Sequence, residues 1–269
     1  MDTTTMTEAE YRLLPAINYS NLKHMRSSPL HFRHKVEVGD EPGLSEKLAV
    51  YRAIHTLVLE PFMFEEEYAI CSMRRDKRTK KYQEFLAENE RKSILSEAEH
   101  EQAVAVSEAV NDHSWVQWIL GLDGTSTEQV LVWDDNKAGA CKGKADIIHY
   151  SPDQGLIIAD LKTTKSTDAH HVRTTAGRSG WHLQFAHYLQ GAARHFGIQL
   201  DEVRYRAFTV VAEATAPHDV SVVEWGGPTL DAGFILHRSL LDRLVDCEDN
   251  QAWPGRATHQ SLDLPDYLL

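Results

Sequence analysis

Two charged residues close an apolar segment, "GLIIADLKTTK", at residues 155–165. Side chains alternate across a β-strand, so Asp160 and Lys162 are expected on one face. Asp146 lies in the preceding run "CKGKADIIHY", and the turn sequence "SPDQG" predicts a hairpin that brings Asp146 close to Asp160. Two neighbouring carboxylates repel unless a cation lies between them. The spacing therefore predicts a site for Mg²⁺, with Mn²⁺ as a substitute, beside a lysine that can stabilise charge on a phosphate.

The pattern D…D-x-K resembles the core of the PD-(D/E)XK nucleases, with Ala145 and Asp146 in place of Pro-Asp. The pattern is short, and many hairpins carry it by chance. The alternative is a surface ion pair between Asp160 and Lys162 at the end of a frayed strand. In that case Asp146, Asp160 and His55 would not converge.

The elements that would position these residues alternate between helix and strand. Residues 45–60 predict a helix with Ser45 as its N-cap, and this helix places His55 on an apolar face. The region 62–121 is charged and rich in helix formers, which predicts a helical insertion. The segments that follow predict three strands in "EQVLVWDD", "CKGKADIIHY" and "GLIIADLKTT", a helix at 181–196, two strands in "EVRYRAFTVVAEA" and "DVSVVEW", and a last helix at 229–246. This order predicts a mixed α/β fold with a central sheet and helices on both sides.

Several further segments, in order along the chain, resemble the RecE-type (exodeoxyribonuclease VIII-like) exonucleases and their phage and prophage relatives. These segments are "NYSNLKHMRSSPLHF", "AVYRAIHTLVLEPFMFEEEYAI", "TEQVLVWDDNKAGACKGKADII", "WHLQFAHYLQGA" with its Q-x-x-x-Y, and the "WPG" and "LDLP" of the tail. The resemblance covers about residues 17 to 267. It implies an α/β, restriction endonuclease-like PD-(D/E)XK core, a central mixed sheet flanked by helices, with a helical insertion.

The resemblance also implies a set of metal ligands. His55, Asp146 and Asp160 would hold the metal, and the backbone carbonyl of Leu161 would complete the shell. For His55 the alternative is a histidine buried in the core, because it shares a helix face with apolar residues.

Four side chains would act beside the metal if the resemblance holds. Lys162 would position the attacking water, and Glu128 would hold metal or water at the edge of the site. Gln184 and Tyr188, four residues apart on one helix face, would hold the lysine or a DNA phosphate. Glu128 can equally be a surface carboxylate at a strand end, and Tyr188 can pack into the core.

Basic residues gather in segments of a chain whose formal net charge is −12. Two such segments are 21–35 and 74–81, and Arg173 and Arg178 lie in an expected loop that could clamp DNA backbone. A solvated surface is the alternative for each. The negative total argues against a general nucleic-acid coat protein but leaves room for an enzyme with local basic patches.

The whole chain of 269 residues is interpreted as one nuclease domain. Its parts would be an N-terminal segment (1–44), the helical insertion (62–121), the catalytic sheet and helix (122–225), and a C-terminal helix and tail (226–269). The three cysteines form no CxxC pair, and no window is as apolar as a membrane span. These features predict a cytoplasmic protein. The resemblance implies a bacterial cell and leaves open a phage, prophage or chromosomal origin.

The function that the resemblance implies is a Mg²⁺-dependent deoxyribonuclease. It would remove nucleotides from the ends of linear double-stranded DNA, 5′ to 3′, for recombination by strand annealing. A ring-shaped homo-oligomer and a single-strand annealing protein are the implied partners. The alternatives are a PD-(D/E)XK endonuclease of restriction or repair type and a catalytically inactive DNA-binding relative.

Overall fold

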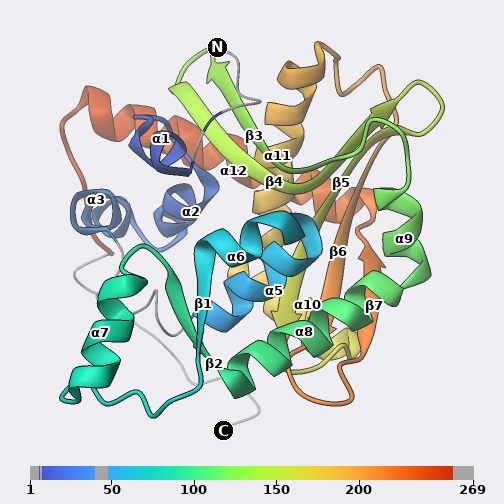
Figure 1. The fold of residues 1–269 in the computed structure, drawn as a ribbon. Helices are drawn as coiled ribbons and strands as arrows, with labels where there is room; N and C mark the ends of the chain where they lie inside the picture. The colour runs from blue at the N-terminus through green and yellow to red at the C-terminus, as the bar shows by residue number, and fades with distance from the viewer. Residues whose placement is uncertain (1–5, 7, 40–47, 257–269) are drawn as a thin grey trace, which may run out of the picture.

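The computed structural model describes residues 6, 8–39 and 48–256, and Figure 1 shows the arrangement of their helices and strands. The N-terminal part holds α1 (Glu8–Leu13), α2 (Tyr19–Leu22), the 3₁₀ turn η1 (Lys23–Arg26) and α3 (Pro29–Val38). The next part holds α5 (Ala49–Leu59), η2 (Pro61–Met63), α6 (Phe64–Glu67), β1 (Tyr68–Cys71), α7 (Lys80–Glu88), β2 (Ser93–Ser96), α8 (Glu97–Asp112) and α9 (Ser114–Leu120). The remainder holds β3 (Ser126–Asp135), β4 (Gly139–Ser151), β5 (Gly155–Thr164), α10 (Ala169–Ser179), α11 (Trp181–Phe196), β6 (Tyr205–Glu213), β7 (Val220–Glu224) and α12 (Gly227–Asp249).

The central sheet has five strands in the order β3-β4-β5-β6-β7. Only β5 and β6 pair in parallel, and the other neighbours are antiparallel. The three-strand meander, the two later strands and the mixed α/β class predicted from the apolar runs are confirmed. Helices α10 and α11 make the crossover between β5 and β6 that a parallel pair requires.

Helices cover both faces of this sheet. In Figure 1, α5 and α8 lie in front of it, and α11 and α12 lie behind it. The front core joins α5, α8 and α9 to alternate residues of β5, including Ile157 and Leu161. The rear core joins α10 and α11 to the other residues of β5, including Leu156 and Ile158. An apolar strand buried on both faces is typical of the centre of such a sheet.

The strands β4 and β5 separate partway along their length. Their pairing runs from Ser151 opposite Gly155 to Ile147 opposite Ala159 and ends there. The next positions in that register are Asp146 and Asp160. The alternation of side chains along β4 is also interrupted at this point. Ala145 and Ile147, two residues apart, would share one face of a regular strand, but Ala145 packs into the rear core and Ile147 into the front core. The two aspartates therefore lie at the fork where the strands part.

The region predicted as a helical insertion also contains a two-stranded sheet. Strands β1 and β2 pair in parallel, from Tyr68 opposite Ser93 to Cys71 opposite Ser96. Each has four residues, too few for an alternating pattern to stand out among charged neighbours. The predicted N-cap Ser45 and the tail motif "LDLP" lie outside the described residues.

The N-terminal segment is hydrogen-bonded to the backbone at the junction between α10 and α11. Tyr19 donates its hydroxyl proton to the carbonyl of Ser179 at 2.7 Å, and Arg26 donates to the carbonyls of Gly177 and Arg178 at 3.1 Å. Arg178 lies in α10 and so does Arg173, so the prediction of a flexible basic loop is wrong. The side chain of Asp168 caps the start of this helix, and Gly180 ends it in the left-handed conformation.

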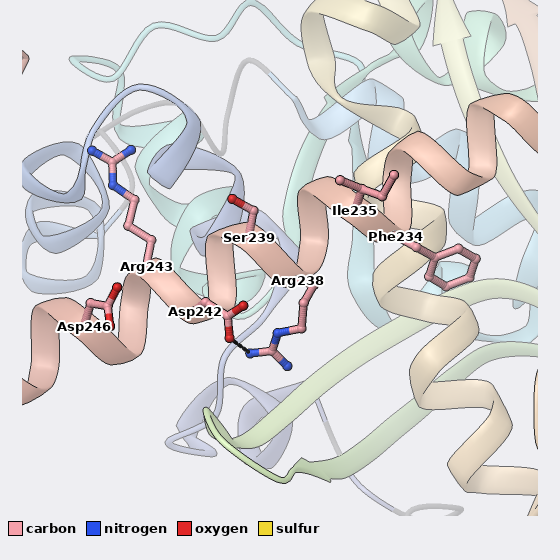
Figure 2. A pocket seen from close by; sticks show the side chains of 7 residues that line it. All are labelled: Phe234, Ile235, Arg238, Ser239, Asp242, Arg243 and Asp246. Carbon is pink, nitrogen blue, oxygen red and sulfur yellow. Dashed lines mark ion pairs between the residues drawn. The ribbon is translucent and has the colours of Figure 1, made fainter.

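A surface hollow lies on α12, and none of the residues that line it belongs to the fork. It is a shallow depression of about 760 Å³, and Figure 2 shows its seven side chains, from Phe234 to Asp246, spread along that one helix. The ion pair between Arg238 and Asp242 lies within it. Among the described residues, no helix is long and apolar enough to cross a membrane.

Candidate metal centre

Three side chains from three elements converge at the fork. His55 comes from α5, Glu128 from β3 and Asp146 from β4, and one ligand atom of each lies within 4.8 Å of the others. The His55 Nδ1 is 3.7 Å from the Asp146 Oδ2. The Leu161 backbone N–H donates to the same Asp146 oxygen at 2.7 Å. Strand β5 therefore holds the Asp146 carboxylate in place.

Glu128 adopts a backbone conformation that is uncommon for its residue type. Its φ is 49°, in the left-handed region, inside a strand where neighbours are extended. The ladder between β3 and β4 pairs Thr127 with Ile147 and Gln129 with Ala145 but has no registered pair at Glu128 and Asp146. Such strained positions persist where the surroundings over-determine them and cluster at functional sites. Here the distortion directs the Glu128 carboxylate toward Asp146 and His55.

A second group of side chains surrounds Asp160, which is only 2% exposed. Its Oδ2 lies 2.5 Å from the Lys162 Nζ, and its Oδ1 accepts a hydrogen bond from the Gln184 Nε2 at 2.6 Å. The Gln184 Nε2 also reaches the Tyr188 hydroxyl at 3.3 Å. Helix α11 therefore holds Asp160 from the rear, while Lys162 remains partly accessible at 27%.

Burial and neighbouring charges shift the pKa values of side chains in both clusters. Burial, together with the positive charges of Lys162 and Lys144, lowers the pKa of His55 to about 3, so its imidazole is neutral and can accept a metal. Burial and the neighbouring carboxylates of Asp160 and Glu128 raise the pKa of Asp146 well above its usual value. Burial alone would lower the pKa of Lys162, but Asp160 and Asp146 outweigh it and raise that pKa, so the ammonium stays charged.

The structure brings together all eight residues that the sequence singled out for the site. His55, Glu128, Asp146 and the Leu161 backbone are in contact or within a few ångström. The metal group found among the described residues contains Glu128 and does not contain Asp160, whose oxygens bind Lys162 and Gln184. The roles of Asp160 and the Leu161 carbonyl as ligands stay predictions.

Sequence reasoning missed Lys144. Its Nζ lies 2.5 Å from the Glu128 Oε2, and its charge acts on His55. A signal was present, because "KAD" at 144–146 mirrors "DLK" at 160–162 on an antiparallel neighbour.

The donor set at the fork fits a divalent cation that prefers oxygen. Two carboxylates and a neutral imidazole are ligands that suit Mg²⁺ or Mn²⁺ better than soft metals. The raised pKa of Asp146 shows that the carboxylates repel one another, which a bound cation would relieve. The three free cysteines are buried elsewhere and take no part. The arrangement can hold a metal ion beside an ammonium group.

Comparison with known proteins gives a family and several similar solved structures. Residues 18–262 match the sequence profile described as "PDDEXK-like domain of unknown function (DUF3799)". The structure is similar to a "putative exonuclease" from Eubacterium rectale, with a TM-score of 0.65 and 15% identity, covering 97% of this chain and 95% of that one. It also matches the protein SSO0001 over 54% of this chain and 68% of the other, with a TM-score of 0.30 and 18% identity. No curated protein matches.

Proposed function

The chain belongs to the PDDEXK-like family DUF3799, and from this premise we propose that it is a divalent metal-dependent nuclease that hydrolyses phosphodiester bonds in DNA. The proposed substrate is linear double-stranded DNA, which the protein degrades from its ends in the 5′ to 3′ direction. One observation carries the chemical part. The ligand atoms of His55, Glu128 and Asp146 lie within 4.8 Å of one another beside the Lys162–Asp160 pair.

The chain's own residues supply positioning and charge. A bound Mg²⁺ would activate water and stabilise negative charge on the phosphate. His55, Glu128 and Asp146 would hold the ion, and the Leu161 N–H fixes the orientation of the Asp146 carboxylate. Lys162, kept charged by Asp160, orients the attacking water and faces the developing charge.

Helix α11 keeps this lysine in place through two side chains. Gln184 holds the Asp160 carboxylate, and Tyr188 holds Gln184. Burial and the charge of Asp160 raise the pKa of Tyr188 well above its usual value, so its phenol remains neutral. Both residues act on the reaction through Asp160 and Lys162.

The proposed preference for DNA ends does not follow from the geometry of the metal centre. It rests on the resemblance to RecE-type exonucleases and on the description of the Eubacterium rectale protein as a "putative exonuclease". A homo-oligomeric ring around DNA and cooperation with a strand-annealing protein belong to the same part of the proposal. Basic segments around such a ring would offset the net charge of −12.

The test is incubation with Mg²⁺ and three DNA forms: a linear duplex labelled at its 5′ ends, the same duplex labelled at its 3′ ends, and a closed circle. Early release of the 5′ label from the linear forms, with the circle intact, is the expected result. Cleavage of the circle would identify an endonuclease instead. No metal-dependent cleavage of any form would refute the nuclease proposal.

Two lysine variants complete the test. Lys162→Ala is expected to lose activity by a factor of about 10² or more, because positioned charge and proton transfer contribute on that scale. Lys80→Ala is the control, because its side chain is 89% exposed and pairs with Glu84 one helical turn away. Equal loss in both variants would point to general DNA binding and not to chemistry at the fork.

A further inference from the structure

Lys144 brings a second ammonium group to the candidate metal centre, in addition to Lys162. Its Nζ lies 2.5 Å from the Glu128 Oε2, and the side chain is 28% exposed. Its charge contributes to the lowered pKa of His55, so it lies within electrostatic reach of the ligand group. Lys144 is therefore part of the site and not an unrelated surface residue.

The two lysines occupy matching positions on the two strands of the fork. The segment Lys144–Ala145–Asp146 is the reverse of Asp160–Leu161–Lys162, and β4 and β5 run antiparallel. The registered ladder ends at Ile147 opposite Ala159, so both lysines lie beyond it, where the strands part. Because Ala145 packs into the rear core, alternation directs Lys144 to the front, whereas Lys162 shares the rear-facing side of Asp160. The two ammonium groups therefore approach the ligand group from the two faces of the sheet.

With all three carboxylates of the site ionised, its charges balance when a metal ion and a phosphate are both present. Glu128, Asp146 and Asp160 carry three negative charges when ionised, and Lys144 and Lys162 carry two positive ones. One divalent ion changes the net charge from one negative to one positive. A single phosphodiester group then neutralises the site. With Lys144 absent, the metal and Lys162 alone would already balance the carboxylates, and nothing positive would remain for the substrate.

We propose, building on the proposed nuclease function, that Lys144 binds a phosphate of the DNA substrate. While the centre holds no metal, Lys144 neutralises Glu128. When Glu128 ligates the ion, the ammonium turns to the phosphate beside it. A lysine suits this exchange, because its charge is compact and its flexible stem lets it change partners. Lys144 and the metal therefore compete for Glu128 but cooperate on the phosphate.

The change in metal affinity on removing Lys144 distinguishes this role from a structural one. A lysine that only fixes the orientation of the Glu128 carboxylate supports metal binding, and its loss would weaken that binding. A competing lysine opposes metal binding, because it occupies Glu128 and repels the cation. Removing it would strengthen metal binding while weakening DNA binding.

The first experiment titrates Mn²⁺ calorimetrically into the wild-type chain and the Lys144→Gln variant, with no DNA present. Lys144→Gln is expected to bind Mn²⁺ roughly three- to tenfold more tightly, because a like charge and a competing partner are removed. Lys144→Arg keeps the charge and is expected to stay near the wild-type affinity. Lys137→Gln is the control, since its ammonium lies in the β3–β4 turn and pairs with Asp242 at 3.6 Å. Thermal unfolding of each variant confirms that it is folded.

The second experiment measures duplex binding by fluorescence anisotropy over a range of NaCl concentrations, in a Lys162→Ala background with Mg²⁺ so that the DNA is not consumed. Adding Lys144→Gln is expected to weaken binding and to reduce the slope of log K against log[NaCl] by about 0.9, the effect of one lost phosphate contact on a duplex. Adding Lys144→Arg or Lys137→Gln is expected to leave the slope unchanged.

Either of two results overturns the role of Lys144: weaker or equal Mn²⁺ binding in Lys144→Gln, or an unchanged salt slope. These outcomes are separate from failure of the proposed function. A wild-type chain that cleaves no DNA defeats the proposed function. A wild-type chain that cleaves DNA while Lys144→Gln keeps the full salt slope defeats only the inference about Lys144.

Discussion

Replacing Asp146 by asparagine should separate stability from metal binding. The Asp146 and Glu128 ligand atoms lie within 4.8 Å of each other, and two unit charges at 4.8 Å in an effective dielectric constant of about 20 repel by about 3.5 kcal/mol. The Lys144 ammonium, 2.5 Å from Glu128, offsets part of this repulsion, whereas the Asp160 carboxylate adds to it, so the value gives the scale of the effect. The asparagine oxygen can still accept from the Leu161 N–H. Without metal, Asp146→Asn is therefore expected to be at least as stable as the wild type, with a gain on the order of 3 kcal/mol.

Bound metal should reverse the order of stability, because it stabilises the wild-type chain more than the Asp146→Asn variant. An ion at 100 times its Kd stabilises the wild-type chain by about 2.7 kcal/mol, or roughly 5 to 11 °C in Tm for a chain of this size. Asp146→Asn loses a charged ligand and should lose most of that gain. Thermal unfolding with Mg²⁺ and with a chelator measures both effects. The pH gives a further check: the raised pKa of Asp146 means that metal-free stability falls as pH rises through that pKa, and the variant should not show this fall.

A carboxylate of the same strand system provides the control. Asp135 pairs with Arg238 at 2.8 Å and accepts backbone hydrogen bonds from residues of the β3–β4 turn. Asp135→Asn should lose stability and keep the full Mg²⁺ gain. A Mg²⁺ gain in Asp146→Asn equal to that of the wild type, or a metal-free Tm several degrees below it, would refute the reasoning.

Other expected outcomes concern packing and acid stability. Gly233→Ala should destabilise the chain by about 1–3 kcal/mol, because a Cβ there would meet the His182 carbonyl oxygen of α11 at 2.2 Å. Gly177→Ala, in α10 with nothing within 4 Å, should instead stabilise it by about 0.5–1 kcal/mol, and urea unfolding that gives both changes one sign would contradict this contrast. His187 and His237 are buried against each other with pKa values lowered to about 3 and about 4, so stability should fall as pH drops below about 6.5, by about 2 kcal/mol for each histidine at pH 5. Equal unfolding free energies at pH 7 and pH 5 would exclude that effect.

The sequence predicted the sheet better than its surroundings, for a physical reason. Long apolar runs such as "GLIIADL" bury both faces of a strand, and the turns between them are explicit. Strands β1 and β2 gave no such signal, because each has four residues and is paired locally. The segment of helix α10 contains basic residues that suggest a DNA-binding loop. Its cap residues, Asp168 and Gly180, are visible in the sequence and indicate a helix instead.

The site was predictable where its residues follow the strand period and unpredictable where the backbone departs from it. Asp160 and Lys162 follow simple alternation. Glu128 reaches the centre through a positive φ that no local sequence signal demanded. Lys144 was overlooked because its partner is a carboxylate whose orientation depends on that same distortion.

The fork between β4 and β5 has a consequence for hydrogen exchange. Below it, Ile147 and Ile148 are tied to both neighbouring strands, and their amides should exchange only when the whole chain unfolds. Beyond it, the β3–β4 ribbon and the β5–β6–β7 sheet share no registered ladder, so each can open by itself. We expect amides of residues 140–145 to exchange in a separate and faster phase. Mg²⁺ would slow that phase selectively, because an ion held by Glu128, Asp146 and His55 links the ribbon to the rest of the molecule.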